Sequence, residues 1–386
     1  MNKQHKGESA TDIIIFQPEF TAFGGEERVI LALSRKLHSL GLPHLVLCYF
    51  DSINFASYAT WPLRVHQLLP KRNPLSKVLS LRRYLQTNYR AGGPIPMLFN
   101  IQSAYHAGFA IQVPYHLRIP DTFSLLSSSQ DHSFPRKLVH VFRDCAVKRG
   151  ISRARRFVTN TQKLATEMET LYGRRATVFY LGGFGKPEET APFRQRNPLE
   201  LLTVSRLQAS KRVSWIIKAL STDGASDAPV LPNWRLHIVG AGPEREALEA
   251  LAKRLSLSDH IVFHGFVADA DLERLYQRAH IFLMPARQGY GLPAIEALYR
   301  RQAVVVSSDS GVSEILEGNN WVSVSLPDET DFKRAVQTLL LRAAKDEFWS
   351  NPLPVLPTED GWAAKITDYC EWRQPHPAEH SPCLTP

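Results

Sequence analysis

A regular alternation of strand and helix patterns between residues 199 and 344 constrains the fold most strongly. Short apolar runs predict strands at 199–205, 235–240, 260–265, 281–286, 303–308 and 321–326. Amphipathic segments separate these runs, and one more follows at about 330–344. Since strands that are joined by helices pair in parallel, the pattern predicts an α/β domain whose parallel sheet is covered on both faces.

The amino-terminal part of the chain predicts a second α/β domain, and 386 residues suit two domains. Asp12–Phe16 reads as a buried strand, and His44–Phe50 reads as the next one. Between them, Gly24 and Gly25 precede a helical pattern that closes at Gly41. This opening places a glycine loop at the carboxyl end of a strand, where α/β proteins bind ligands.

Composition excludes several classes of protein. The chain is 44% hydrophobic and 22% charged, as ordinary globular proteins are. No apolar run approaches the roughly 18 residues that a membrane-spanning helix needs. The four cysteines have neither C-x-x-C nor metal-ligand spacing, and the N-terminus does not resemble a signal peptide. We therefore expect a cytoplasmic protein. Peripheral association with the inner face of the membrane is compatible with this expectation.

Positive charge is concentrated between Trp61 and Asn160, where sixteen Lys or Arg face three Asp, a net +13. The whole chain carries only +9, so the remainder is net acidic. Such a segment attracts lipid headgroups, nucleic acid or a pyrophosphate-bearing acceptor, whereas the simpler alternative is a solvated basic face. The amphipathic helix predicted at 75–89 has the same two interpretations, bilayer surface or ordinary solvated helix.

A glycine loop follows the strand predicted at 281–286 and opens a short helix with Pro293 at its start and Glu296 in its first turn. A strand, glycine loop and helix aim backbone N–H groups at an anion. The Glu296 carboxylate could then hold the hydroxyls of the same ligand. An ordinary turn with a solvated glutamate is the alternative.

Two cations follow the strand predicted at 199–205. Arg206 comes directly after the strand, and Lys211 stands at the start of the next helix. Arginine offers a planar fork for phosphate oxygens and lysine a mobile point charge, so the pair could clamp a diphosphate. The alternative is two exposed surface cations.

Three motifs resemble those of retaining nucleotide-sugar glycosyltransferases of the GT-B fold, the large family four. QGYGLPAIEAL (288–298) resembles E-G-F-G-L-P-x-x-E-A, GGEERV (24–29) resembles GGAERV, and SRLQASK (205–211) resembles G-R-L-x-x-x-K. The resemblance implies two Rossmann-like domains facing a central cleft, a UDP- or GDP-sugar donor, a glycan or lipid-linked acceptor, and retention of configuration. Gln288 stands where the family has glutamate, and Ser205 stands where glycine is commoner.

Carried over residue by residue, the resemblance implies both catalytic and donor-binding positions. The catalytic ones are His116, Arg206, Lys211 and Gln288; the donor-binding ones are Gly24, Gly25, Ser205, Arg206, Lys211, Gly265, Phe266, Gln288, Gly289, Tyr290, Gly291, Leu292 and Glu296. His106 is the alternative to His116 for the histidine that faces the donor sugar. No metal or other cofactor is expected, because Asp269 and Asp271 directly precede a helix and are better explained as its start.

The expected organisation has five parts: an acceptor-side domain at 1–185, a linker at 186–198, a nucleotide-sugar domain at 199–360, a closing helix at 361–374 that packs back on the first domain, and a disordered tail at 375–386. Because Gln288 departs from the family, a catalytically silent module that binds a nucleotide sugar or a partner protein is the alternative function. A nucleic-acid-binding protein ranks last, since the basic segment lacks a recognisable aromatic platform.

Overall fold

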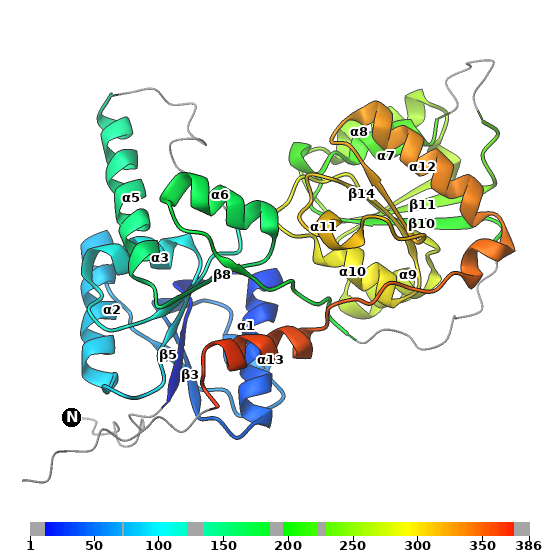
Figure 1. Ribbon diagram of the computed structural model, residues 1–386. Helices are drawn as coiled ribbons and strands as arrows, with labels where there is room; N and C mark the ends of the chain where they lie inside the picture. The colour runs from blue at the N-terminus through cyan, green and yellow to red at the C-terminus, as the bar shows by residue number, and fades with distance from the viewer. Residues whose placement is uncertain (1–11, 72, 122–133, 186–195, 222–228, 374–386) are drawn as a thin grey trace, which may run out of the picture. The chain divides into compact units, whose positions relative to one another are not determined.

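The computed structural model describes residues 12–71, 73–121, 134–185, 196–221 and 229–373 (Figure 1). The chain divides into two compact units, one formed by 1–181 with 359–386 and the other by 182–358. We call these the first and second units. The expected tail at 375–386 and most of the expected linker at 186–198 lie outside the described residues.

The first unit contains a parallel sheet with the strand order β5-β3-β1-β6-β7-β8-β9. Numbered along the chain, this order is 3-2-1-4-5-6-7, so its direction reverses between β1 and β6, as in a Rossmann fold. Its strands are β1 (Ile13–Phe16), β3 (His44–Cys48), β5 (Val65–Gln67), β6 (Met97–Phe99), β7 (His116–Arg118), β8 (Arg156–Thr159) and β9 (Thr177–Val178); β2 (Glu19–Phe20) and β4 (Phe50–Asp51) form a separate parallel pair.

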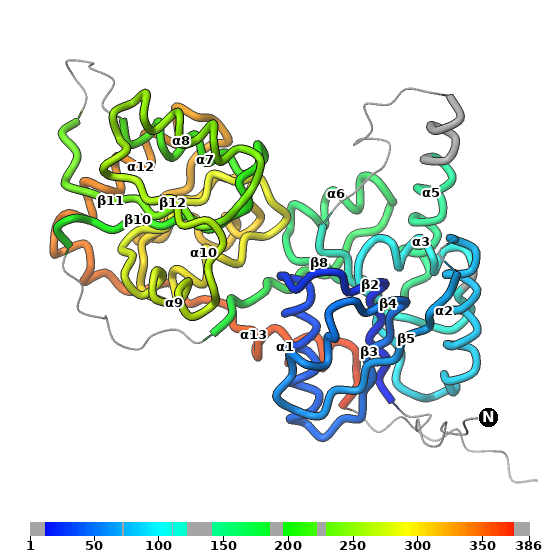
Figure 2. The backbone as a smooth tube through the Cα atoms, turned by 180° about the vertical axis from the view of Figure 1, so that it is seen from behind, coloured from blue at the N-terminus to red at the C-terminus, as the bar shows by residue number. Residues whose placement is uncertain are grey.

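Helices cover both faces of this sheet, with α1 and α13 on one side and α2 and α3 on the other (Figures 1 and 2). The helices are α1 (Gly25–Ser39), α2 (Pro74–Asn88), α3 (Ile101–Ala110), α5 (Phe134–Arg153), α6 (Gln162–Tyr172) and α13 (Glu359–Tyr369). The closing helix therefore begins at Glu359, two residues before its expected start, and it packs against α1 within the first unit.

The second unit contains the predicted parallel sheet, with the order β12-β11-β10-β13-β14-β15. Its strands are β10 (Leu199–Val204), β11 (Trp234–Val239), β12 (Ile261–Gly265), β13 (Ile281–Met284), β14 (Ala303–Ser307) and β15 (Val322–Ser325). Its helices are α7 (Val213–Ala219), α8 (Arg245–Arg254), α9 (Asp269–Arg278), α10 (Leu292–Tyr299), α11 (Ser313–Leu316) and α12 (Glu329–Ala343). Figure 1 shows α7, α8 and α12 on one face of the sheet and α9 and α10 on the other.

Short 3-10 turns complete the described chain at η1 (Phe55–Tyr58), η2 (Ala209–Lys211), η3 (Ser258–His260) and η4 (Asp346–Ser350). Helix α9 begins at Asp269 and not at the predicted Leu272, and its N-cap residue is Ala268, so both aspartates lie inside the first turn. Their carboxylates thus face the positive end of the helix dipole. No helix in the described ranges is long and apolar enough to cross a membrane.

The helix predicted from the basic segment exists as α2, but its apolar face is engaged within the protein. Val78, Leu81 and Leu85 are buried in the core of the first unit, whereas Leu75 is exposed. Five cations of the segment also form ion pairs with carboxylates from outside it. These pairs are Arg64–Asp12, Lys77–Glu19, Arg118–Glu26, Arg155–Glu371 and Arg156–Glu371. The excess positive charge counted along the sequence is therefore partly neutralised in the fold.

Candidate functional site

The predicted donor residues of the second unit lie at the carboxyl edge of its sheet, on both sides of the point where strand order reverses. Counted along the chain, the order is 3-2-1-4-5-6, and the reversal falls between β10 and β13. In open α/β sheets such a reversal opens a crevice for ligands. The loop at 205–212 follows β10, and the loop at 285–291 follows β13.

The loop after β13 has a conformation that only glycine accommodates at Gly291. This residue has φ +113°, and an added Cβ would lie 2.8 Å from Met284 Cε and 2.8 Å from Ser310 Oγ. The turn is anchored on β14's side, because Val312 N–H donates to the Tyr290 carbonyl at 2.8 Å. Helix α10 then begins at Leu292, one residue before the predicted start.

Lys211 and Gln288 meet across the two loops, with 3.1 Å between Lys211 Nζ and Gln288 Oε1. The Gln288 amide also donates from Nε2 to Met284 Sδ at 2.8 Å, which fixes the side chain against the end of β13. A glutamine is a neutral partner, so this contact does not cancel the charge of Lys211. A lysine held beside an uncharged amide can stabilise an anionic leaving group.

Arg212 and Asp309 join the same two sides of the switch point, and the sequence patterns did not identify them. Arg212 adopts φ +51° and donates to Asp309 at 3.2 and 2.8 Å, and also to the Pro285 carbonyl at 3.2 Å. Ser307 Oγ donates to Asp309 at 2.7 Å. A signal did exist for Asp309, because SSDSG places it directly after the strand predicted at 303–308, whereas Arg212 only adjoins Lys211 at the start of a predicted helix.

Glu296 lies beyond the first turn of α10 and not in it as predicted, because the helix begins at Leu292 and not at Pro293. It is beside the segment at 182–185. The Phe184 N–H points toward Glu296 Oε1 at 3.5 Å. Gly183 allows this approach, because an added Cβ would lie 3.0 Å from Ile295 Cγ2 and 3.1 Å from Glu296 Cγ. The sequence did not predict this contact, since more than a hundred residues separate the two segments.

Ser205 and Arg206 leave β10 beside Gly240, in the loop after β11. Ser205 N–H continues the ladder to the Val239 carbonyl at 3.0 Å, and Arg206 is exposed. At Gly240, an added Cβ would lie 1.8 Å from the Ser205 carbonyl oxygen, so only glycine fits. The close approach holds the Ser205 backbone while Arg206 extends into solvent.

Gly265 ends β12 and Phe266 follows it, at the same edge of the sheet. Gly265 has φ +68°, and the Phe266 side chain is 89% exposed. The structure therefore places the residues predicted for the second unit on one edge, at the ends of β10, β12 and β13. It brings Lys211 and Gln288 into direct contact.

Behind Gly265, a buried polar chain crosses three strands of the second unit. Glu200 of β10 accepts from His237 of β11 at 2.8 Å, and His237 Nδ1 lies 2.9 Å from His264 Nε2 of β12. Burial alone would raise the pKa of Glu200, but hydrogen bonds from His237 and Arg278 outweigh it and hold the pKa below its ordinary value. The chain fixes the strand that carries the Gly265 turn.

In the first unit, Gly24 and Gly25 lie at the start of α1, beyond the carboxyl end of β1. Gly24 has φ −154°, which any residue adopts, so its backbone does not require glycine. The Gly24 N–H donates to Glu27 Oε2 at 3.0 Å. Burial raises the pKa of Glu27 above its ordinary value, and the charge of the neighbouring Glu26 raises it further.

The structure does not support a catalytic role for His116. It is the first residue of β7, so it lies at the amino edge of the sheet, opposite the edge that carries Gly24. Its ring is 1% exposed and packs against Trp372, with 6.2 Å between ring centroids. Burial and the charges of Arg156 and Arg155 lower its pKa to about 3. Its environment is that of a neutral core histidine.

The alternative, His106, is also a core histidine. It lies inside α3 with 2% exposure, and its Nδ1 is 2.9 Å from the Tyr49 hydroxyl. Burial, together with Lys77 and Arg143, lowers its pKa to about 3. The sequence could not distinguish these histidines from ligand-facing ones, because the register that decides which edge of the sheet a residue occupies is tertiary information.

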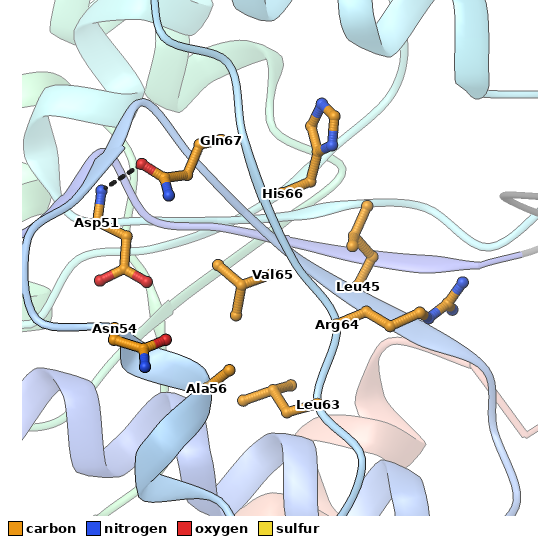
Figure 3. Close-up of a pocket in the computed structure, with 9 residues that line it drawn as sticks. All are labelled: Leu45, Asp51, Asn54, Ala56, Leu63, Arg64, Val65, His66 and Gln67. Atoms are coloured by element: carbon orange, nitrogen blue, oxygen red, sulfur yellow. Dashed lines mark hydrogen bonds between the residues drawn. The ribbon is translucent and has the colours of Figure 1, made fainter. Parts of the chain in front are cut away.

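A pocket of about 470 Å³ lies in the first unit, beside the edge strand β5. It is lined by Leu45, Asp51, Asn54, Ala56, Leu63, Arg64, Val65, His66 and Gln67 (Figure 3). The Asp51 carboxylate accepts from Ile53 N–H at 3.1 Å and Phe55 N–H at 2.8 Å, so it already caps η1. None of the predicted site residues lines this pocket. Among the described residues, no three His, Cys, Asp or Glu side chains form a group that could hold a metal ion.

Comparison with known proteins supports the resemblance to glycosyltransferases. Residues 187–351, almost all of the second unit, match the sequence model of the family Glycosyl transferases group 1. An uncharacterized glycosyltransferase of Methanocaldococcus jannaschii is 33% identical over 134 residues, which are 33% of this chain and 33% of that protein. The match thus spans about a third of this relative's length.

Solved structures resemble the chain over most of its length. Sucrose-phosphate synthase from Thermosynechococcus elongatus has a TM-score of 0.68 at 16% identity and covers 94% of this chain and 98% of its own. Anabaena HepE in complex with UDP has a TM-score of 0.66 at 18% identity and covers 92% and 95%. The fold is therefore α/β of the GT-B type, with two Rossmann-like domains.

Proposed function

We propose that this chain is a retaining, metal-independent hexosyltransferase that transfers a sugar from a UDP- or GDP-sugar to a saccharide or lipid-linked acceptor. The observation that carries the proposal is the Lys211–Gln288 contact of 3.1 Å at the switch point of the second unit. The exposed Arg206 follows β10 at the same edge of the sheet, and α10 begins shortly after Gln288. The UDP named in the HepE structure supports a uridine nucleotide as one candidate donor.

In the proposed reaction, the bond between the anomeric carbon and the diphosphate breaks, an acceptor hydroxyl bonds to that carbon, and its proton passes to the departing diphosphate. The departing diphosphate gains charge, which Arg206, Lys211 and the backbone N–H groups at the start of α10 would stabilise in place. Glu296 would hold the ribose hydroxyls. The Gln288 amide would accept from one donor-sugar hydroxyl and donate to another acceptor atom.

Replacing Lys211 or Arg206 with alanine tests the clamp. Each change should cost about 1.5–3 kcal/mol of nucleoside diphosphate binding, an increase of roughly 10- to 150-fold in Kd. Lys218→Ala is the matched control, because Lys218 also belongs to the α7 region but pairs with Glu329 of α12. Calorimetric titration with UDP and GDP measures the effect. Unchanged Kd values in both site variants would refute the clamp.

The second candidate is a silent module that binds a nucleotide sugar or a partner protein without turnover, and the neutral Gln288 is what favours it. Nucleotide release from a panel of UDP- and GDP-sugars separates the two functions. For an active enzyme, Gln288→Ala should lower kcat/KM, and Gln288→Glu should raise activity or change the preferred donor. A silent module would release no nucleotide with wild type or with Gln288→Glu, although UDP or GDP still bound.

Two further parts of the proposal concern metal and membrane. Turnover should survive EDTA, because the stabilising charges are side-chain cations and a helix start; a strict requirement for a divalent ion would contradict this.

We also propose a cytoplasmic protein that associates peripherally with anionic membrane through the basic segment 61–160. Sedimentation with anionic and neutral vesicles at low salt tests it, and equal binding to both, or salt-sensitive binding to nucleic acid alone, would refute it.

A further inference from the structure

The carboxyl edge of the first unit's sheet carries a second group of polar side chains, separate from the residues described for the second unit. Gln17 follows β1, Asn100 follows β6, Arg118 ends β7 and Asn160 follows β8. These strands are neighbours in the sheet, and Gln17 and Asn100 flank the point where its strand order reverses. Asn100 Nδ2 donates to Gln17 Oε1 at 3.2 Å.

Arg118 is the centre of this group and is completely buried. Its guanidinium lies over the rings of Phe99 and Trp362, with 5.3 and 5.6 Å to the ring centroids. One nitrogen donates to Asn160 Oδ1 at 3.1 Å, and buried Nε has no hydrogen-bond partner among the described residues. A buried cation of this kind requires a carboxylate, since an uncompensated buried charge is strongly destabilising.

That carboxylate is Glu26, whose Oε2 accepts from Arg118 at 2.7 Å. The Glu26 side chain is 31% exposed, and its other oxygen makes no hydrogen bond to a described residue. One carboxylate oxygen is therefore fixed by a buried arginine, and the other remains available at the carboxyl edge of the sheet. A carboxylate held in this way is a strong acceptor for hydroxyl groups, because it is charged and has already lost its rotational freedom.

The start of α1, by contrast, is closed to a phosphate. The Gly24 N–H already donates to Glu27 at 3.0 Å, and Glu26 and Glu27 place two carboxylates in the first turn. These carboxylates already compensate the positive end of the helix dipole, and their negative charge would repel a phosphate. The paired glycines, which the resemblance implied as donor-binding positions, thus do not have the surroundings of a phosphate site.

We propose that Glu26 is a specificity-determining residue that binds a hydroxyl of a neutral saccharide, and that Arg118 is the residue that positions it. This inference rests on the proposed function, because it names the substrate chemistry of the first unit in a sugar transfer. The ligand at this edge is a polyol recognised through its hydroxyls, and a phosphate group is excluded from it.

The test is saccharide binding by the full chain, measured by saturation-transfer NMR. The probes are the methyl glycosides of glucose, galactose, mannose and N-acetylglucosamine, with UDP or GDP present. Wild type should bind at least one glycoside. Glu26→Gln and Arg118→Met should each weaken it several-fold, and the double change Glu26→Ala with Arg118→Met should weaken it about ten-fold or more. The double variant removes both charges, so it avoids leaving a buried cation without its partner.

Glu371→Gln is the control, because it breaks another arginine–glutamate pair of the first unit, with Arg156 at the amino edge of the sheet. It should leave glycoside binding unchanged, and no variant should alter the Kd for UDP or GDP. The inference is overturned if the double variant binds as wild type does, if no glycoside binds wild type, or if glycerol phosphate displaces the bound glycoside. Loss of nucleotide binding by wild type would instead overturn the proposed function.

Discussion

Replacing Gly291 with alanine should destabilise the second unit by about 2–5 kcal/mol through two separable effects. An L-residue at φ +113° costs about 1–2 kcal/mol of backbone strain. The new Cβ would also lie 2.8 Å from Met284 Cε and from Ser310 Oγ. The methionine can move, but Ser310 Oγ is held by the Tyr290 carbonyl at 3.2 Å, so overpacking adds about 1–3 kcal/mol.

Gly318→Ala isolates the backbone effect. Gly318 also has positive φ, +79°, and belongs to the same unit, but nothing lies within 4 Å of its added Cβ. Urea unfolding of both variants and wild type gives the comparison, with the slope m checked for constancy. Gly291→Ala should lose about 1–3 kcal/mol more than Gly318→Ala. It should also raise the Kd for nucleoside diphosphate, because the displaced loop carries Gln288, whereas Gly318→Ala should not.

Equal losses in the two variants, within about 0.5 kcal/mol, would show that the space around Gly291 does not constrain the loop. A large loss of stability with unchanged nucleotide affinity would refute the second step, that the loop geometry serves donor binding. Each outcome addresses a different part of the argument, because stability reports the packing of the turn and affinity reports its position.

Two further predictions follow from the second unit. The folded-state pKa of Glu200 lies below its unfolded value of 4.5, so its contribution to stability is present above pH 4.5 and is lost as pH falls through the folded pKa. The difference in unfolding free energy between wild type and Glu200→Gln should therefore shrink on acidification. A difference that does not depend on pH would contradict this prediction. A double-mutant cycle of Arg212→Ala and Asp309→Ala should give a coupling energy of about 1–3 kcal/mol in thermal or urea unfolding, because the pair is part-buried and makes two hydrogen bonds. If the losses of unfolding free energy in the two single variants simply add, other contacts hold the two loops together.

The architecture of each unit could be predicted from the sequence because it depends on local pattern. Apolar runs of four to six residues that alternate with amphipathic segments leave little choice but a parallel sheet. The same pattern located Arg206 directly after one strand, Lys211 before the next helix, and Gln288 in the glycine loop after another strand. Helix α3 escaped prediction because its hydrophobic pattern is weak and Gly108 interrupts it. That glycine is explained only by packing, since an added Cβ would lie 1.9 Å from the Ala146 carbonyl oxygen of α5.

Contacts between distant segments could not be predicted. The pairing of Lys211 with Gln288 depends on β10 and β13 being neighbours, and a strand order is not written in either loop. His116 shows that sequence patterns can also predict a site residue that the fold does not support. His116 looked like a ligand residue in the sequence, but it lies at the amino edge of its strand, where Trp372 of the carboxyl-terminal segment covers it.

Charge shows most clearly what each level decides. The sequence alone determined two α/β domains, glycine loops at strand ends, and a stretch with a net +13 between Trp61 and Asn160. Only the tertiary structure decided which of those charges face a ligand or a surface, because the carboxylates that form ion pairs with them come from outside the stretch. Arg118 is the extreme case: it counts as surface charge along the chain, yet it is buried beside Glu26, ninety-two positions away. Coulomb interactions depend on distance in space and on burial, and neither can be read from separation in sequence.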